Sequence, residues 1–171
     1  SPKPFQRPRP PIWLGSPGQA GVRRVARWGL EGFAGSPSTA NYQRYLTKCR
    51  EFGTEATAQT QVLLFGHLNV NSSEAWTEAE PYATHLHTTY RDWARAAGND
   101  RTFRAGPRED LVIGDPDHWL QRAQPALTAG AIAPDHLIVQ LQLPGMPHTT
   151  VMRSIELFAR ELLPQLSQTH S

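Results

Sequence analysis

Four residues near the start of the chain have types and spacing suited to binding a phosphate group. Gly15, Ser16, Gly18 and Gln19 lie in the turn between a short apolar run and a helical stretch. The first N–H groups of a helix lack partners within the helix and mark its positive dipole end, so such a turn suits an anion. The glycines would allow close approach of the backbone, and the serine hydroxyl could donate. The alternative is an ordinary turn in which Ser16 only caps the helix.

His67 is the candidate catalytic residue, because it lies near the end of the clearest predicted strand, 61–70. In barrels of alternating strands and helices, catalytic groups gather at the carboxyl ends of the strands. An imidazole there can act as an acid or a base, or hydrogen-bond a ligand. Asn69 shares the same strand face, since side chains alternate with a period of two. The alternative is a histidine that only packs within the sheet.

No metal site is predicted. His85 and His87 are two apart in a predicted helix and therefore do not share a face, and no carboxylate or cysteine obviously completes a ligand set. The sequence contains no G-x-S-x-G elbow, Walker loop or G-x-G-x-x-G fingerprint. The net charge of +2 is too small to indicate nucleic-acid binding, and the sequence contains no nucleic-acid-binding motif.

The composition is that of an ordinary globular protein. The 171 residues are 39% hydrophobic and 19% charged, enough for one domain with a core. No apolar run approaches the roughly 20 residues needed to span a bilayer, and the first residues lack a secretory h-region. Cys49 is the single cysteine, which excludes an internal disulfide. We therefore expect a cytoplasmic protein with no membrane association.

Basic residues are concentrated at the start, where six of them precede the first acidic residue, Glu31. The simpler interpretation is a solvated helix face plus a basic linker. The alternative is that one of them faces an anionic cofactor. The six are Lys3, Arg7, Arg9, Arg23, Arg24 and Arg27.

Hydrophobic periodicity predicts an alternation of strands and helices, which is typical of a parallel sheet with right-handed crossovers. About four βα units are expected, half of an eightfold barrel, with the stretch 99–114 irregular apart from 111–113. Pro81 should kink or split its helix, and Pro164 should end the last one. The predicted strands are 11–15, 31–35, 61–70 and 136–143, and the predicted helices 19–28, 39–53, 73–97, 116–129 and 149–163.

The first residues resemble a connector rather than the beginning of a domain. They start at Ser1 without methionine and are rich in proline. We expect a connector at 1–10, a half-barrel domain at 11–165 and a tail at 166–171. A half-barrel leaves strand edges unpaired, so it would need its missing half, another copy of itself or a partner.

Several short motifs occur in the order and spacing of one protein family, and together they extend almost from end to end. By them the chain resembles the C-terminal half of the luciferase-like, flavin-dependent monooxygenase superfamily. The motifs are 6–16 (QRPRPPIWLGS), 23–29 (RRVARWG), 112–117 (VIGDPD), Gly130 ahead of 136–139 (HLIV), 144–146 (PGM) and 154–164 (SIELFARELLP).

The resemblance implies a fold, a cofactor and a reaction. The fold would be the C-terminal half of a TIM-type (β/α)8 barrel. The cofactor would be reduced flavin mononucleotide (FMN), or a deazaflavin coenzyme in one branch. With molecular oxygen, the enzyme would oxidise a small organic substrate, and a separate flavin reductase would supply the flavin. The first four strands of the barrel are absent, so this chain would be incomplete as an enzyme alone.

The resemblance also assigns roles and leaves alternatives open. The turn that contains Gly15 and Ser16 would approach the flavin phosphate, and strand ends near His67 and Gln140 or Gln142 would line the pocket. One alternative is a deazaflavin-dependent hydride-transfer enzyme, which would not consume oxygen. The other is a non-catalytic half-barrel subunit or fragment that pairs with another chain.

Overall fold

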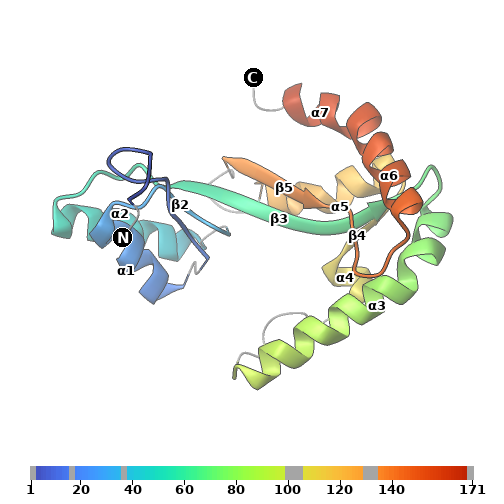
Figure 1. The fold of residues 1–171 in the computed structure, drawn as a ribbon, viewed down its shortest axis with the longest axis horizontal. Helices are drawn as coiled ribbons and strands as arrows, with labels where there is room; N and C mark the ends of the chain where they lie inside the picture. Colours follow the sequence, from blue (N-terminus) through green and yellow to red (C-terminus); the bar gives the residue numbers. More distant parts are fainter. Residues whose placement is uncertain (1–2, 16–17, 36–37, 99–105, 129–134, 169–171) are drawn as a thin grey trace. The chain divides into compact units, whose positions relative to one another are not determined.

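The chain folds into two compact units, and strand β3 belongs to both. The first unit comprises residues 1–63 and 126–138, and the second comprises 64–125 and 139–171. Figure 1 shows the elements of each unit along the chain. The structure is a computed structural model that describes residues 3–15, 18–35, 38–98, 106–128 and 135–168.

Five strands form one sheet in the described part of the chain. Neighbours pair in the order β1-β2-β3-β4, and each of these pairs is parallel, while β5 also pairs with β3. Helices follow the strands, as parallel pairing requires. The prediction of an α/β fold with parallel strands is therefore confirmed. The strands are β1 (Trp13–Leu14), β2 (Gly32–Phe33), β3 (Gln59–Leu68), β4 (Val112–Gly114) and β5 (His136–Gln140).

Strand β4 lies in the stretch that was expected to be mostly irregular, which raises the number of strands above the four predicted. Its three residues pair with the end of β3, in the register Gly66 to Val112, His67 to Ile113 and Leu68 to Gly114. Leu111 and the two apolar residues of β4 are buried. Three residues are too few to show an alternating pattern in sequence, so burial and pairing define this strand.

Two helices and their shared core form the centre of the first unit. Helices α1 (Gln19–Trp28) and α2 (Thr39–Phe52) each end, as predicted, at a glycine with positive φ: Gly29 at 54° and Gly53 at 68°. The Oγ of Ser38 caps α2 by accepting from the N–H of Asn41. The buried side chains of this core are Val22, Val25, Ala26, Leu30, Phe33, Tyr45, Cys49 and Ala58.

The second unit is built around the long helix α3 (Ser72–Ala96), whose start was predicted. Asn71 is its N-cap, and its Oδ1 accepts from the N–H groups of Ser73 and Glu74. Ala75, Ala79 and Ala83 form a stripe of small buried side chains that lets β4 pack closely against this helix. The remaining helices are α4 (Pro107–Asp110), most of α5 (Pro116–Thr128), α6 (His148–Leu157), a π-helical turn (Phe158–Leu162) and α7 (Leu163–Gln168).

Contrary to the sequence prediction, Pro81 does not split its helix, and Pro164 does not end the last helical segment. Helix α3 continues through Pro81 without division, and Pro81 is exposed on its surface. The last helical segment continues past Pro164, because the π-helical turn ends at Leu162 and α7 begins at Leu163. Pro164 therefore lies just after the π-helical turn, in a backbone that stays helical through Leu163.

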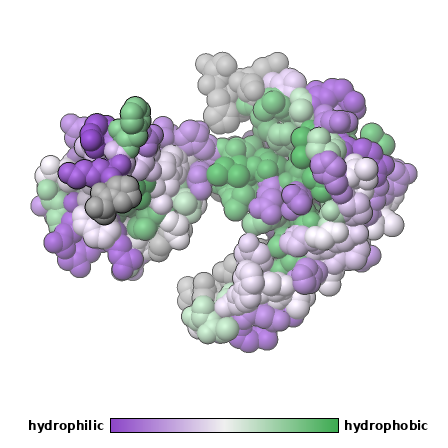
Figure 2. Space-filling view, in the orientation of Figure 1, coloured by the Kyte–Doolittle hydropathy of each residue, from purple (hydrophilic) through white to green (hydrophobic). Residues whose placement is uncertain are grey.

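Each unit keeps apolar side chains at its surface. Leu63 and Ile138 in the first unit are 43% and 44% exposed, and Ile155 and Leu163 in the second are 41% and 50% exposed. Figure 2 shows green, apolar residues on the visible face of the second unit. In the described part of the chain, no helix combines the length and apolar character needed to cross a membrane.

Candidate functional site

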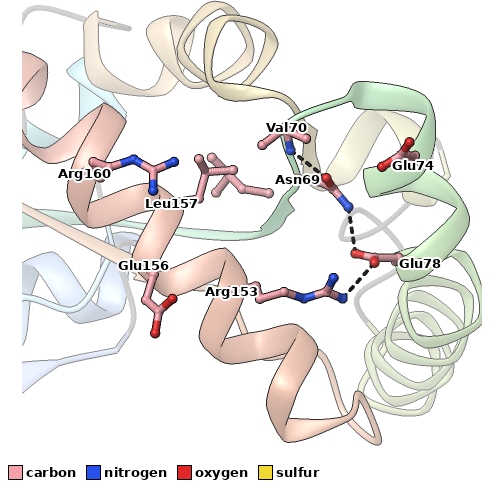
Figure 3. Close-up of a pocket in the computed structure, with 9 residues that line it drawn as sticks. Asn69, Val70, Glu74, Glu78, Arg153, Glu156, Leu157 and Arg160 are labelled. Atoms are coloured by element: carbon pink, nitrogen blue, oxygen red, sulfur yellow. Dashed lines mark hydrogen bonds and ion pairs between the residues drawn. The ribbon is translucent and has the colours of Figure 1, made fainter.

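A cavity of about 400 Å³ lies at the carboxyl end of β3, between α3 and α6. Polar and charged side chains contribute most of its walls, with three apolar residues between them. Figure 3 shows Arg153 reaching from α6 toward Glu78 of α3, with Asn69, which follows the end of β3, beside them. The lining residues are Leu68, Asn69, Val70, Glu74, Glu78, Arg153, Glu156, Leu157 and Arg160.

Glu78 connects the cavity to His67. One carboxylate oxygen, Oε2, lies 3.0 Å from His67 Nε2 and accepts from the Asn69 amide at 3.1 Å. The other oxygen, Oε1, accepts from Arg153 at 2.9 Å. His67 lies on β3, whereas Asn69 comes directly after the strand ends at Leu68, so the predicted strand 61–70 extends two residues too far. Both side chains nevertheless reach the same carboxylate of α3.

His67 itself is buried, with 1% of its side chain exposed, and it does not line the cavity. Burial lowers the pKa of His67 below its ordinary 6.5, against the opposing effect of the Glu78 carboxylate. The imidazole is therefore neutral near pH 7, and its Nε2–H donates to Glu78. Its Nδ1 is buried without a partner among the described residues. The His67 ring is therefore linked to the cavity only indirectly, by its hydrogen bond to Glu78.

Glu78 stays ionised although its side chain is partly buried. Burial acts to raise its pKa, but the hydrogen bonds from His67 and Asn69 and the charge of Arg153 hold it below the ordinary 4.5. A carboxylate with three donors is fixed in one orientation. The cavity therefore presents an immobilised anion that is paired with Arg153, and Arg160 lines the same cavity, so it can bind a polar ligand or orient one.

The buried His67 predicts a pH dependence of folding. Its pKa is lower in the folded than in the unfolded state, so its contribution is fully present above about pH 6.5. It is lost as pH falls toward the folded pKa, because only the unfolded chain takes up the proton. The free energy of unfolding should fall with a slope of up to about 1.4 kcal/mol per pH unit below pH 6.5. Urea titrations between pH 7 and 5 measure this slope.

A matched pair of variants isolates the effect of His67. His67→Gln should remove the added slope, whereas His85→Gln, at an exposed position on α3, should leave it in place. The same slope in the His67 variant and in the parent protein would show that another group carries the dependence.

The turn predicted to bind phosphate lies in the first unit, apart from this cavity. Ser16 lies outside the described residues, while Gly15, Gly18 and Gln19 are exposed. Gly18 is the N-cap of α1 with an extended φ of −71°, and no side chain caps the helix there. The first turn of α1 contains no acidic residue. Among the described residues, the N–H groups at this helix start therefore have no side-chain acceptor.

The arginines near this turn divide into two groups. Arg9 forms an ion pair with Glu31 at 2.7 Å and donates to the carbonyl of Gly29, so it fastens the connector to the end of α1. That pairing lowers the pKa of Glu31 to about 2, through the hydrogen bond from Arg9 and then that from the Ile12 N–H. The second group lies on the exposed face of α1, around a shallow cavity of about 280 Å³ lined by Ala20, Arg23, Arg24, Arg27 and Trp28.

Other predicted residues lie elsewhere. Gln140 donates to the carbonyl of Gln142, and neither of them lines the cavity at β3. His87 is buried and contacts Asp110 at 3.0 Å, whereas His85 is exposed. Within the described ranges, no three His, Cys, Asp or Glu side chains are grouped as a metal would require.

Sequence reasoning did not select Glu78 or Arg153. Arg153 lies 75 residues after Glu78, and nothing local connects them. For Glu78 a signal existed, because it adjoins the alanine stripe of α3 and follows a strand with two polar residues on one face. An acidic residue beside a buried helix face requires a partner, and His67 and Asn69 are the nearest candidates along the chain.

Parallel strands joined by helices, with a polar cavity at the carboxyl end of a strand, place the chain among α/β proteins of the barrel-forming class. The sequence model described as luciferase-like monooxygenase matches residues 1–162. The chain therefore belongs to the luciferase-like monooxygenase family.

Solved structures share this fold at low sequence identity. A monooxygenase from Streptomyces bottropensis superposes with a TM-score of 0.64 and 19% identity, over 96% of this chain and 51% of that one. The oxygenating constituent of 3,6-diketocamphane monooxygenase from Pseudomonas putida, a type II Baeyer-Villiger enzyme in complex with FMN, gives 0.61 and 18%, over 92% and 49%. Flavoprotein 390 gives 0.55 and 11%, over 95% and 69%. The chain thus spans about half the length of the first two, which are TIM-barrel enzymes. No functionally curated protein matches it significantly.

Proposed function

We propose that this chain is the C-terminal half of a flavin-dependent monooxygenase that oxidises a small organic substrate with reduced FMN and molecular oxygen. The observation that carries the proposal is the family match over residues 1–162, combined with the shared fold of two monooxygenases, one of which holds FMN. Both of those chains are about twice as long as the matched part. The proposed domain is 11–165, with a connector at 1–10 and a tail at 166–171.

The start of α1 fits a phosphate group. Its N–H groups have no side-chain cap, its first turn has no acid, and Arg23 follows Gln19 by one helical turn. A flavin phosphate would accept from the N–H groups behind Gly18 and from the hydroxyl of Ser16. A Cβ at Gly18 would meet no atom within 4 Å, so a ligand can approach the backbone there. Bound reduced flavin supplies the electrons that activate oxygen.

In this proposal His67 is a positioning residue. It holds the Glu78 carboxylate from the buried side, while Arg153 and Asn69 hold it from the cavity. The carboxylate is then fixed at the carboxyl end of β3, where barrel enzymes place polar groups. The proposed consequence is a site whose side chains are already ordered before a polar substrate binds. Binding then loses little free energy to the ordering of those side chains.

The proposed enzyme requires a second half-barrel. The exposed apolar side chains of Leu63, Ile138 and Ile155 are those expected where a complementary half would pack. The four missing βα units, or a second copy of this chain, would provide that cover. A flavin reductase would supply the reduced cofactor, as the family resemblance implies.

The first experiment is FMN binding to this chain, followed by the quenching of flavin fluorescence. Saturable binding is expected, and Ser16→Asp should weaken it about tenfold or more, because a carboxylate in this turn would repel the phosphate. Ser38→Asp is the matched control, since Ser38 caps α2 and aspartate is an equally good cap there.

Four outcomes decide between the alternatives. Equal weakening by both substitutions would contradict a phosphate site at this turn, and so would the absence of saturable quenching. Oxygen consumption with reduced FMN and the other half-barrel present would support a monooxygenase. Hydride transfer to a deazaflavin without oxygen uptake would replace it with the other branch of the family.

A further inference from the structure

A second cavity of the same unit, about 270 Å³ in volume, has the character of an anion site. It shares no lining residue with the cavity at β3. Helix α3 borders both, but Ser72 and Trp76 project on one side of the helix and Glu74 and Glu78 on the other, as a period of 3.6 requires. The lining residues are Ser72, Trp76, Arg108, Ile113, His118 and Arg122.

The two arginines of this cavity are held in place. The guanidinium carbon of Arg108 lies 3.9 Å from the ring centroid of Trp76, a cation–π contact that orients the group. Arg122 donates through one terminal nitrogen to the carbonyls of Arg108 at 3.1 Å and Glu109 at 2.6 Å. Across the described part of the chain, neither guanidinium forms an ion pair with a carboxylate. Both therefore retain N–H donors and an unbalanced positive charge.

Donors prevail among the side chains around the cavity. Its lining contains no carboxylate, and the indole N–H of Trp76 is buried with no acceptor among the described residues. The hydroxyl of Ser72 is occupied by Asp115, 2.6 Å away at Oδ2. Asp115 also accepts the N–H of His118 at the start of α5, so its charge is already balanced by that helix end. A ligand with several hydrogen-bond acceptors would therefore match the donors around this cavity.

We propose that this cavity binds the phosphate group of a phosphate monoester. A phosphate monoester carries nearly two negative charges at neutral pH and three acceptor oxygens, which matches two guanidinium groups that come from different elements. The cavity is bordered by Ile113 of β4, and barrels of this type commonly bind phosphate beside their last strands. The proposal does not depend on the flavin site at α1, because no residue is common to the two.

Isothermal titration calorimetry with inorganic phosphate, at an ionic strength kept constant with sodium chloride, tests the proposal. Saturable binding is expected, and Arg108→Gln and Arg122→Gln should each weaken it at least about tenfold, as the loss of a charge-assisted hydrogen bond predicts. Arg95→Gln removes the same charge from α3 at a side chain that is 71% exposed and lines neither this cavity nor the one at β3. That control should change the affinity by less than about twofold.

Three results would overturn the proposal. They are the absence of saturable binding by the parent protein, equal weakening in all three variants, and acetate binding as tight as phosphate. Circular dichroism verifies that each variant is folded. If Arg122→Gln unfolds, Arg122→Lys keeps the charge but not the fork of donors and should still bind phosphate less tightly than the parent protein.

Discussion

Replacement of Glu78 by alanine is expected to lower the free energy of unfolding by about 2 kcal/mol. The reason is that the side chains of His67, Asn69 and Arg153 all lose the carboxylate that accepts their hydrogen bonds. Of these donors, the His67 Nε2–H is the most costly to leave unpaired, since only 1% of its side chain is exposed. Asn69 and Arg153 reach water more easily, and their loss is smaller. Equilibrium unfolding in urea measures the change.

Glu74→Ala is the matched control for this prediction. Glu74 lies one helical turn earlier on α3 and lines the same cavity, but its exposed carboxylate forms no ion pair among the described residues. Its removal should change stability by less than about 0.5 kcal/mol. A double-mutant cycle then identifies the partner. In a His67→Phe background the Glu78→Ala cost should shrink, and an unchanged cost would mean that the imidazole contributes nothing.

The sequence predicted the local parts of this site and missed the part made by distant segments. The strand pattern of 61–70 placed His67 and Asn69 on one face, and the N-cap at Asn71 fixed where α3 begins. Those two predictions bring the strand and helix together, because the connection between them is only a few residues long. Arg153 could not be predicted in this way, since α6 reaches the site from the other end of the chain.

The same division applies to the fold. Helix ends at Gly29 and Gly53 follow from the residues themselves, because glycine adopts positive φ without strain. Strand β4 and the continuation past Pro164 depend on neighbours instead. The first is a strand because its residues pair with β3, and the second follows a π-helical turn that no sequence pattern announces.

Gly66 lets β3 lie close to both β4 and the Trp119 side chain of α5. Its replacement is the prediction with the largest expected effect. Gly66 pairs with Val112 of β4, and a Cβ there would collide with the carbonyl oxygen of Val112. The same Cβ would lie 3.1 Å from the indole nitrogen of Trp119, a fully buried side chain that packs edge-on against Phe158 at 5.3 Å. Only glycine, which has no Cβ, leaves room for both the Val112 carbonyl and the Trp119 indole.

Gly66→Ala should therefore cost about 3 kcal/mol of unfolding free energy, because the backbone of β3 must move away from β4. Gly15→Ala is the control, since its Cβ would have Ala34 as nearest neighbour at 4.0 Å, and it should cost less than about 1 kcal/mol. Trp119→Phe separates the two contacts. If the double variant with Gly66→Ala regains the stability of Trp119→Phe alone, the indole causes the strain. If it stays equally destabilised, the backbone of Val112 does, and this second result is expected because a carbonyl in a paired strand cannot yield as a side chain can.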